Sequence, residues 1–313
     1  MNYRTLGATG VKVSALAYGG SSLGSAFRDI DEAEGIRSVH VALDHGINLI
    51  DTAPYYGATK AETVLGKALQ GVARDRYILA TKVARYGPTL ADFDFSAARV
   101  TRSVDESLAR IGVDHIDFIQ VHDMEFGDLD QIVNETIPAL RRLQATGKVR
   151  FVGISCLPVH LYKAVMDRVD VDQIQSYCHY CLNDTALADQ LPYFKAKGVG
   201  IFNSAPLAMR LLSNEGPPAW HPAPPALVAK CAEAAARCKA RGADLGKLAL
   251  QYSMANPEMH THIVGTASPA RVLQNIADAE APLDLALLAE VLAILAPVHN
   301  LTWPSGRPEN NRV

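Results

Sequence analysis

Short apolar runs recur along the chain, and each is followed by an amphipathic stretch of helical length. Eight of these runs predict strands, at residues 14–20, 47–51, 77–82, 115–122, 149–155, 172–176, 198–205 and 262–266. Helices are predicted between and after them, at residues 31–46, 60–70, 96–111, 129–146, 158–168, 187–197, 224–255, 268–279 and 284–296. Because the strands are almost continuously apolar, both of their faces should be buried, which is typical of a parallel sheet covered by helices.

Eight alternating units predict an α/β fold closed as a (β/α)₈ TIM barrel. The alternative is an open doubly wound sheet, which would need a glycine-rich phosphate loop after its first strand. The sequence GGSSLG at 19–24 lacks the required GxGxxG spacing. A length of 313 residues would allow two domains, but an α/β barrel commonly fills it as one, so we expect a single domain over residues 1–313. The Pro-rich segment 216–225 and the tail after Pro297 should be loops near the barrel mouth.

Composition narrows the class of function. The chain is 49% hydrophobic and 20% charged with a net charge of −3, and it has no long basic run, so we expect a small-molecule partner and neither nucleic acid nor membrane. The N-terminus shows no secretory signal and no apolar stretch approaches spanning length, which favours a cytoplasmic location. The five cysteines fit reduced thiols; Cys178 and Cys181 have redox or zinc spacing, but without a second pair we predict apolar fillers and no metal site.

Four ionisable side chains stand where predicted strands run into loops. The second strand ends at Asp51 with Tyr56 on its loop, the third ends at Lys82 and the fourth at His122. Each alone has an ordinary explanation, such as a cap, loop packing, a surface charge or a buried histidine. Together they would meet at the C-terminal mouth of the barrel, where Asp51 supplies the counter-charge that a desolvated Lys82 needs. Beside that cation the pKa of Tyr56 should fall from about 10 toward the working pH, which would make the phenol an acid–base group.

The motifs DTAPYYG at 51–57, ATK at 80–82 and QVHD at 120–123 resemble the aldo-keto reductase superfamily. The resemblance covers nearly the whole chain, and RTLGATGVKVSAL at 4–16 is similar to the β-hairpin that plugs the barrel bottom in that superfamily. It implies a catalytic tetrad of Asp51, Tyr56, Lys82 and His122. Further stretches, among them SYCHYCLND, GPPAWHPA and NLTWPSG, resemble members that oxidise L-galactose or L-fucose type aldoses at C1.

The resemblance also implies a mechanism, in which hydride passes between nicotinamide and the sugar C1 while Tyr56 exchanges a proton with the C1 oxygen. Lys82 would tune Tyr56, Asp51 would hold Lys82, and His122 would orient the reacting oxygen. Oxidation would yield a lactone. Candidate walls of the sugar pocket are Tyr55, Asp123, Phe126 and Trp303, because hexose binding needs aromatic faces and hydroxyl acceptors. The alternative for Phe126 and Trp303 is that they only pin loops.

Cofactor contacts are implied with departures from the family pattern. Ser155 and Gln175 match the residues that hold the nicotinamide amide, but Cys156 stands in an Asn position, and Ser204 stands where many members stack a tyrosine. The loop after Ser204 should still wrap the pyrophosphate with backbone N–H groups. The predicted cofactor residues are Gly20, Ser155, Gln175, Ser204, Pro206, Leu207, Met209, Gly265, Thr266, Arg271 and Asn275.

The coenzyme is expected to be NAD, with NADP possible. Gly265 stands where NADP-specific members often carry a lysine, and Arg271 alone is a weaker clamp for a 2′-phosphate. Two alternative functions stay open, an NADPH-dependent reductase of aldehydes or ketones and a non-catalytic redox-sensing subunit. The intact tetrad favours an enzyme, which we expect to be a monomer or weak homodimer.

Overall fold

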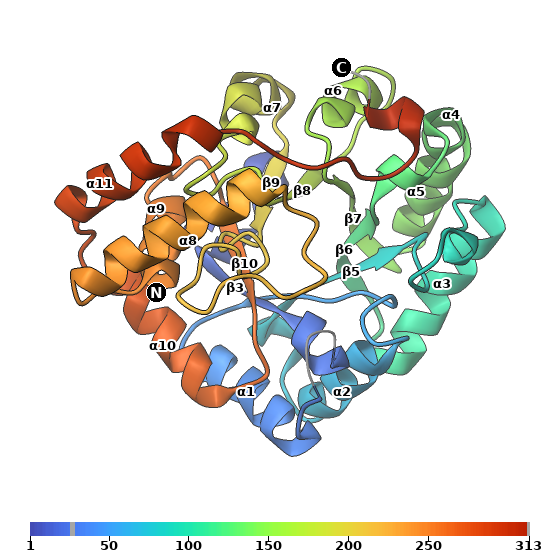
Figure 1. Cartoon of the computed structure of the whole chain (residues 1–313). Coiled ribbons are helices and arrows are strands. Elements are labelled where there is room, and N and C mark those ends of the chain that lie inside the picture. The colour runs from blue at the N-terminus through green and yellow to red at the C-terminus, as the bar shows by residue number, and fades with distance from the viewer. Residues whose placement is uncertain (26–28, 312–313) are drawn as a thin grey trace.

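Eight parallel strands close into a barrel in the computed structural model, which describes residues 1–25 and 29–311 (Figure 1). Each strand pairs with the next along the chain, and the last returns to the first, so the barrel prediction is confirmed and the open sheet is wrong. The strands are β3 (Leu16–Gly19), β4 (Leu49–Asp51), β5 (Ile78–Val83), β6 (Ile116–Val121), β7 (Val149–Cys156), β8 (Gln173–Tyr177), β9 (Gly200–Ser204) and β10 (Thr261–Gly265).

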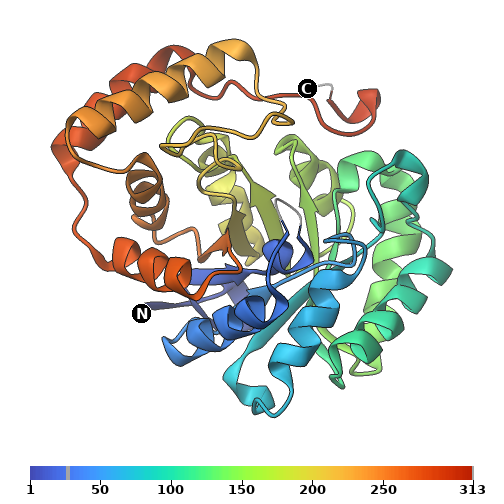
Figure 2. The same ribbon diagram turned by 60° about the horizontal axis from the view of Figure 1, so that its bottom comes forward.

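Helices surround the barrel at the predicted places (Figure 2). They are α1 (Glu32–Asp44), α2 (Lys60–Leu69), α3 (Ala97–Ile111), α4 (Leu129–Gln131), α5 (Ile137–Ala145), α6 (His160–Met166), α7 (Leu191–Lys197), α8 (Pro225–Ala240), α9 (Leu245–Met254), α10 (Pro269–Glu280) and α11 (Leu285–Leu295). Local signals set their ends: the Ser96 side chain caps α3 by accepting from Arg99 N, and Gly112 ends it in the left-handed conformation.

The predicted helix at 224–255 is wrong as one element, because the chain turns between α8 and α9. Gly242 has a φ of +67°, which a helix interior does not accommodate. Two residues later the Asp244 side chain accepts a hydrogen bond from Lys247 N and starts α9. The predicted helix at 129–146 is continuous over residues 129–145, but residues 132–136 form a π-helical turn just before Pro138, a residue without an N–H to donate.

An antiparallel hairpin closes the N-terminal end of the barrel, as the motif at 4–16 predicted. Strands β1 (Tyr3–Thr5) and β2 (Lys12–Ser14) pair with each other and stand apart from the barrel sheet. Between them Leu6 is fully buried against barrel-interior residues such as Phe118 and Phe202. Gly7 has a φ of +48°, and a Cβ there would lie 2.5 Å from the Gly198 carbonyl oxygen, so the hairpin tip needs glycine.

The mouth at the opposite end is bordered by two long segments. The segment 205–224 follows β9 without helix or strand, as predicted for its Pro-rich part, and a C-terminal segment runs from α11 toward α6 (Figure 1). The five cysteines are free and lie in the apolar core, which confirms them as packing residues. No single helix in the described part of the chain is long and apolar enough to cross a membrane, and only the pair α10 with residues 285–298, bent by 102°, meets both criteria together.

Candidate active site

Lys82 and Asp51 form a buried ion pair at the C-terminal ends of β5 and β4. Lys82 Nζ lies 2.8 Å from each Asp51 carboxylate oxygen and 2.8 Å from the carbonyl oxygen of Thr52. The side chains are only 1% and 3% exposed. Burial disfavours the ammonium, but the contacts with Asp51 outweigh it and raise the pKa of Lys82. The predicted counter-charge for Lys82 is therefore in place.

The ring of Tyr56 lies between this pair and His122. Lys82 Nζ is 5.1 Å from its ring centroid, and the His122 ring lies edge-on with the centroids 5.8 Å apart. The expected fall in the pKa of Tyr56 is wrong: burial raises the pKa to about 12, although Lys82 pulls it down. Loss of hydration outweighs the attraction of the ammonium, so the phenol is protonated at neutral pH.

His122 is a neutral, buried imidazole. Burial lowers the pKa of His122 to about 3, with the charges of Lys82 and Arg85 adding to that effect. Its Nε2 lies 3.7 Å from Asp123 Oδ2, and its Nδ1 has no hydrogen-bond partner among the described residues. The ring can therefore give or take a hydrogen bond at the reacting oxygen without gaining charge.

The predicted amide-binding residues stand at one level of the barrel. Ser155 and Gln175 are paired in register on β7 and β8, and Gln175 Nε2 lies 3.4 Å from Asp51 Oδ2. Gln175 Oε1 and Ser204 Oγ are buried without a hydrogen-bond partner among the described residues. Buried polar atoms are normally paired, so these two indicate a ligand or water at this level.

The remaining predicted cofactor residues lie at the end of β10, in the segments that follow β3, β9 and β10, and, for Arg271 and Asn275, on α10. Ala208, Met209 and Arg210 are consecutive left-handed residues with φ of 46°, 52° and 77°. The N–H groups of Met209 and Arg210 donate to no described residue, and such runs of free N–H groups cradle anions. The others are Gly20, buried against Asp51; Pro206 and Thr266, buried; Leu207 and Asn275, half-buried; and Gly265 and Arg271, exposed.

Two of the four predicted sugar-pocket residues adjoin the tetrad. Tyr55 lies edge-on to His122 with ring centroids 5.9 Å apart, and Asp123 follows His122 in the chain. Phe126 stacks on Phe93 at 4.6 Å, one shell farther out. Trp303 packs edge-on against His221 of the 205–224 segment at 5.2 Å, and no contact ties it to the tetrad. The alternative prediction, that Trp303 only pins a loop, therefore fits its contacts better.

Two ionisable residues of the mouth escaped the sequence prediction, the half-buried Arg85 and the buried Glu125. Arg85, three residues after Lys82, donates to Asp123 and stacks on Tyr55. Glu125 accepts hydrogen bonds from Leu157 N, Tyr177 and Ser305. The position of Arg85 just past a strand end was an available signal, whereas the partners of Glu125 come from distant segments.

A family model for the aldo/keto reductases matches residues 15–296. The chain belongs to the aldo/keto reductase family. It is therefore an enzyme of a family that uses nicotinamide cofactors. The unpaired Gln175 and Ser204 atoms and the anion cradle at 208–210 fit such a cofactor.

Sequence matches to relatives of this aldo/keto reductase cover almost its whole length. L-galactose dehydrogenase of Arabidopsis thaliana is 50% identical, and the match covers 98% of each chain. D-threo-aldose 1-dehydrogenase of a Pseudomonas species is 29% identical over 91% of this chain and 94% of its own. Among solved structures, the holo form of aldo-keto reductase AKR11C1 from Bacillus halodurans superposes with a TM-score of 0.80 at 28% identity, covering 100% of both chains.

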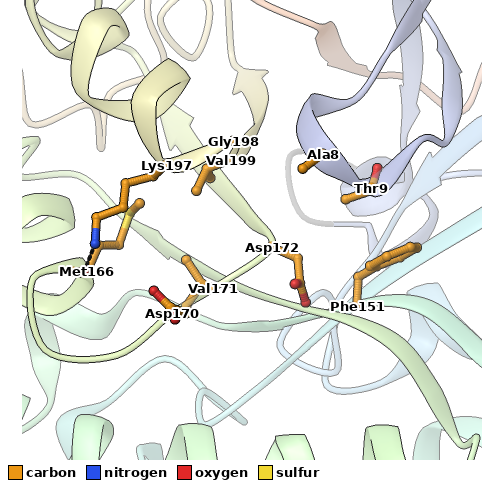
Figure 3. Close-up of a pocket in the computed structure, with 10 residues that line it drawn as sticks. All are labelled: Ala8, Thr9, Phe151, Met166, Asp170, Val171, Asp172, Lys197, Gly198 and Val199. Carbon is orange, nitrogen blue, oxygen red and sulfur yellow. Dashed lines mark hydrogen bonds between the residues drawn. The ribbon is translucent and has the colours of Figure 1, made fainter.

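A pocket of about 330 Å³ opens at the other end of this aldo/keto reductase, between the hairpin and the start of β9 (Figure 3). Two of its polar side chains are already engaged: Asp172 pairs with Arg141, and Lys197 donates to the Met166 carbonyl. The hairpin and the barrel interior separate it from Lys82, so it takes no part in the site. Residues 1–25 and 29–311 contain no group of three or more His, Cys, Asp or Glu side chains that could hold a metal ion.

Glu125 links the mouth to the C-terminal segment. Its Oε1 accepts from Ser305 Oγ at 2.9 Å, and its carbonyl oxygen accepts from Asn310 Nδ2 at 2.8 Å. A Cβ on Gly306 would lie 2.3 Å from that same carbonyl oxygen. Burial, together with the nearby charge of Asp123, raises the pKa of Glu125 to about 8.

We expect the Glu125 carboxyl to make the stability of the enzyme pH-dependent. Its contribution is fully present below the unfolded pKa near 4.5 and is lost as pH rises toward the folded pKa of about 8. Glu125→Gln should abolish that loss, which amounts to about 1.4 kcal/mol per pH unit within the window. Urea unfolding at pH 5.5, 7 and 8.5 measures it, with the exposed Glu258→Gln as control. A stability difference between variant and wild type that stays constant with pH would contradict this assignment.

Proposed function

We propose that this enzyme oxidises the C1 hydroxyl of a cyclic aldose of L-galactose or L-fucose type to the lactone, with NAD as the hydride acceptor. The observation that carries the proposal is the 50% identity with an L-galactose dehydrogenase over 98% of both chains. The arrangement of Tyr56, Lys82 and His122 around one point supports it, because a C1 oxygen placed there would meet a phenol and an imidazole together.

The chain's own residues handle the proton. Tyr56 takes the proton from the C1 hydroxyl during oxidation and returns it during reduction. Because burial favours the neutral phenol, the phenolate that oxidation requires must be stabilised, and Lys82 does so while Asp51 holds its ammonium in place. Neutral His122 orients the C1 oxygen by a hydrogen bond. The nicotinamide, when bound, supplies the hydride acceptor.

The cofactor would be held by groups that otherwise lack partners. Gln175 Oε1 and Ser204 Oγ would bind the carboxamide, with Ser155 at the same level. The free N–H groups of Met209 and Arg210 would bind the pyrophosphate. Cys156 does not replace the amide-binding Asn, because its Sγ donates to the Pro158 carbonyl at 3.4 Å.

The preference for NAD is supported at Gly265. Gly265 has no side chain, so this position offers no cation to pair with a 2′-phosphate. Arg271 remains as an exposed cation at the start of α10, the one feature that favours NADP. Gly20, Thr266 and Asn275 would line the path of the adenosine half.

The test is a panel of L- and D-aldoses with each coenzyme, followed by the absorbance of the reduced nicotinamide. We expect oxidation of sugars with the L-galactose configuration at C2 to C4, a higher kcat/KM with NAD than with NADP, and a lactone that hydroxylamine traps. Equal rates on D-glucose would contradict the sugar assignment. Reduction of simple aldehydes with NADPH and no sugar oxidation would replace the proposal with the reductase alternative.

A further inference from the structure

Two neighbouring strands end in strained residues on the mouth of the barrel. Ala84 follows Lys82 and Val83 of β5 with a φ of +81°, and Asp123 follows β6 with a φ of +49°. Neither is glycine, and such strained residues concentrate at functional sites. The two turns bring Arg85 and Asp123 together, and the Arg85 guanidinium donates from Nη1 to Asp123 Oδ2.

Aromatic rings hold the guanidinium in one orientation. Its Cζ lies 3.7 Å from the centroid of the Tyr55 ring, 5.3 Å from that of Phe93 and 5.9 Å from that of Phe126. The Arg85 side chain is 19% exposed. Its Nε is buried and has no hydrogen-bond partner among the described residues. A fixed, largely desolvated cation with a free donor is arranged for recognition, because leaving that donor unpaired is costly.

The pair adjoins the reacting position. Asp123 Oδ2 lies 3.7 Å from His122 Nε2, so the carboxylate lies beside the imidazole that orients the reacting oxygen. Asp123 is buried, and no described residue donates to its Oδ1. An acceptor at Oδ1 and a donor at Arg85 Nε therefore remain unused beside the tetrad.

We propose that Arg85 determines substrate specificity, by holding Asp123 and its own Nε where they bind the hydroxyl groups next to the reacting carbon. The ligand class is a polyhydroxy substrate with a hydroxyl on C2 that donates to Asp123 and an adjacent oxygen that accepts from Arg85. The inference rests on the proposed aldose oxidation and adds the residue that reads the hydroxyl pattern. Arg85 acts on binding and orientation, and Tyr56 still performs the proton transfer.

The chain offers a matched control for Arg85. Arg99 on α3 stacks on Tyr86 at 3.6 Å, pairs with Glu106 at 3.2 Å, and has a side chain that is 17% exposed. It is another arginine stacked on a tyrosine and paired with a carboxylate, but that carboxylate, Glu106, belongs to α3 and not to the site. Arg85→Met and Arg99→Met therefore remove the same kind of interaction at two places.

The experiment compares the best aldose of the panel with its 2-deoxy analogue. For Arg85→Met we expect KM for the parent sugar to rise by about 10- to 100-fold, the range that losing a charged hydrogen bond implies, with kcat changed much less. The ratio of kcat/KM between parent and 2-deoxy sugar should fall toward one. Asp123→Asn should lower the same ratio, Arg85→Lys should restore part of it, and Arg99→Met should leave it unchanged.

The outcomes separate this inference from the proposed function. If wild-type enzyme oxidises no aldose, the proposed function fails. If it oxidises one, and Arg85→Met keeps the wild-type ratio between the parent and deoxy sugars, the role of Arg85 is wrong while the function stands. Coenzyme affinity of each variant, measured by titration, shows whether the barrel is folded, and Arg85→Lys carries the test should Arg85→Met fail to fold.

Discussion

Tyr56→Phe should lower turnover by about 10²- to 10⁴-fold, the range for losing a positioned acid–base group. The substitution removes one oxygen and leaves the ring between Lys82 and His122, where it packs edge-on to the imidazole at 5.8 Å between centroids. Coenzyme affinity and the unfolding midpoint should therefore change little. Steady-state kinetics with the best sugar of the panel, together with a coenzyme titration, make the measurement.

The adjacent tyrosine is the matched control for this experiment. Tyr55→Phe also removes one hydroxyl, but it keeps the ring face on which the Arg85 guanidinium stacks at 3.7 Å. We expect this variant to retain turnover within a few-fold of wild type. Comparable losses in both variants would assign the effect to disturbed packing at the mouth, and full activity of Tyr56→Phe would remove Tyr56 from the mechanism.

Lys82→Met should destabilise the fold as well as abolish activity. The substitution leaves the Asp51 carboxylate in a site where it is 3% exposed and has lost both hydrogen bonds from Lys82. Breaking a buried pair on one side costs about 3–5 kcal/mol, because the remaining charge is neither hydrated nor compensated. Urea unfolding at neutral pH measures the loss. A free energy of unfolding equal to that of wild type would contradict the cost that we assign to the uncompensated Asp51 carboxylate.

Two further variants assign the cause of that loss. Adding Asp51→Asn to Lys82→Met removes the uncompensated charge, so the double variant should regain much of the stability while staying inactive. Lys67→Met is the control for a lysine in an exposed pair, since Lys67 and Glu32 are 48% and 45% exposed. Exposed pairs contribute about 0–1 kcal/mol, so this variant should unfold close to wild type.

The barrel was predictable because its signals are local. A buried strand must be apolar and short, and a residue such as Asp51 or Lys82 at the end of such a run can only face the edge where the loops meet. The single long helix predicted at 224–255 was wrong, although the sequence contains the signals for two helices. Gly242 favours the end of the first helix, and Asp244 caps the start of the second. The alanine-rich helical pattern on both sides of Gly242 and Asp244 favoured one continuous helix.

The charges of the site were less predictable than its residues. The pKa of Tyr56 depends on a balance between burial and the ammonium of Lys82, and burial wins by an amount that composition does not reveal. The roles of Arg85 and Glu125 depend on partners brought together by folding. Glu125 and Ser305 lie 180 residues apart in the sequence, so nothing local marks their contact.

That distant contact has a consequence for motion. The residues after α11 contact Glu125 at the mouth through Ser305, Gly306 and Asn310. They form no part of the strand pairing that closes the barrel. They can therefore detach in a local, partial opening that leaves the strands paired, and their amides should exchange with solvent hydrogen sooner than those of β6. Ionising Glu125 inside its buried site would make that detachment easier, so alkaline solution should loosen the rim of this enzyme well before it melts the barrel.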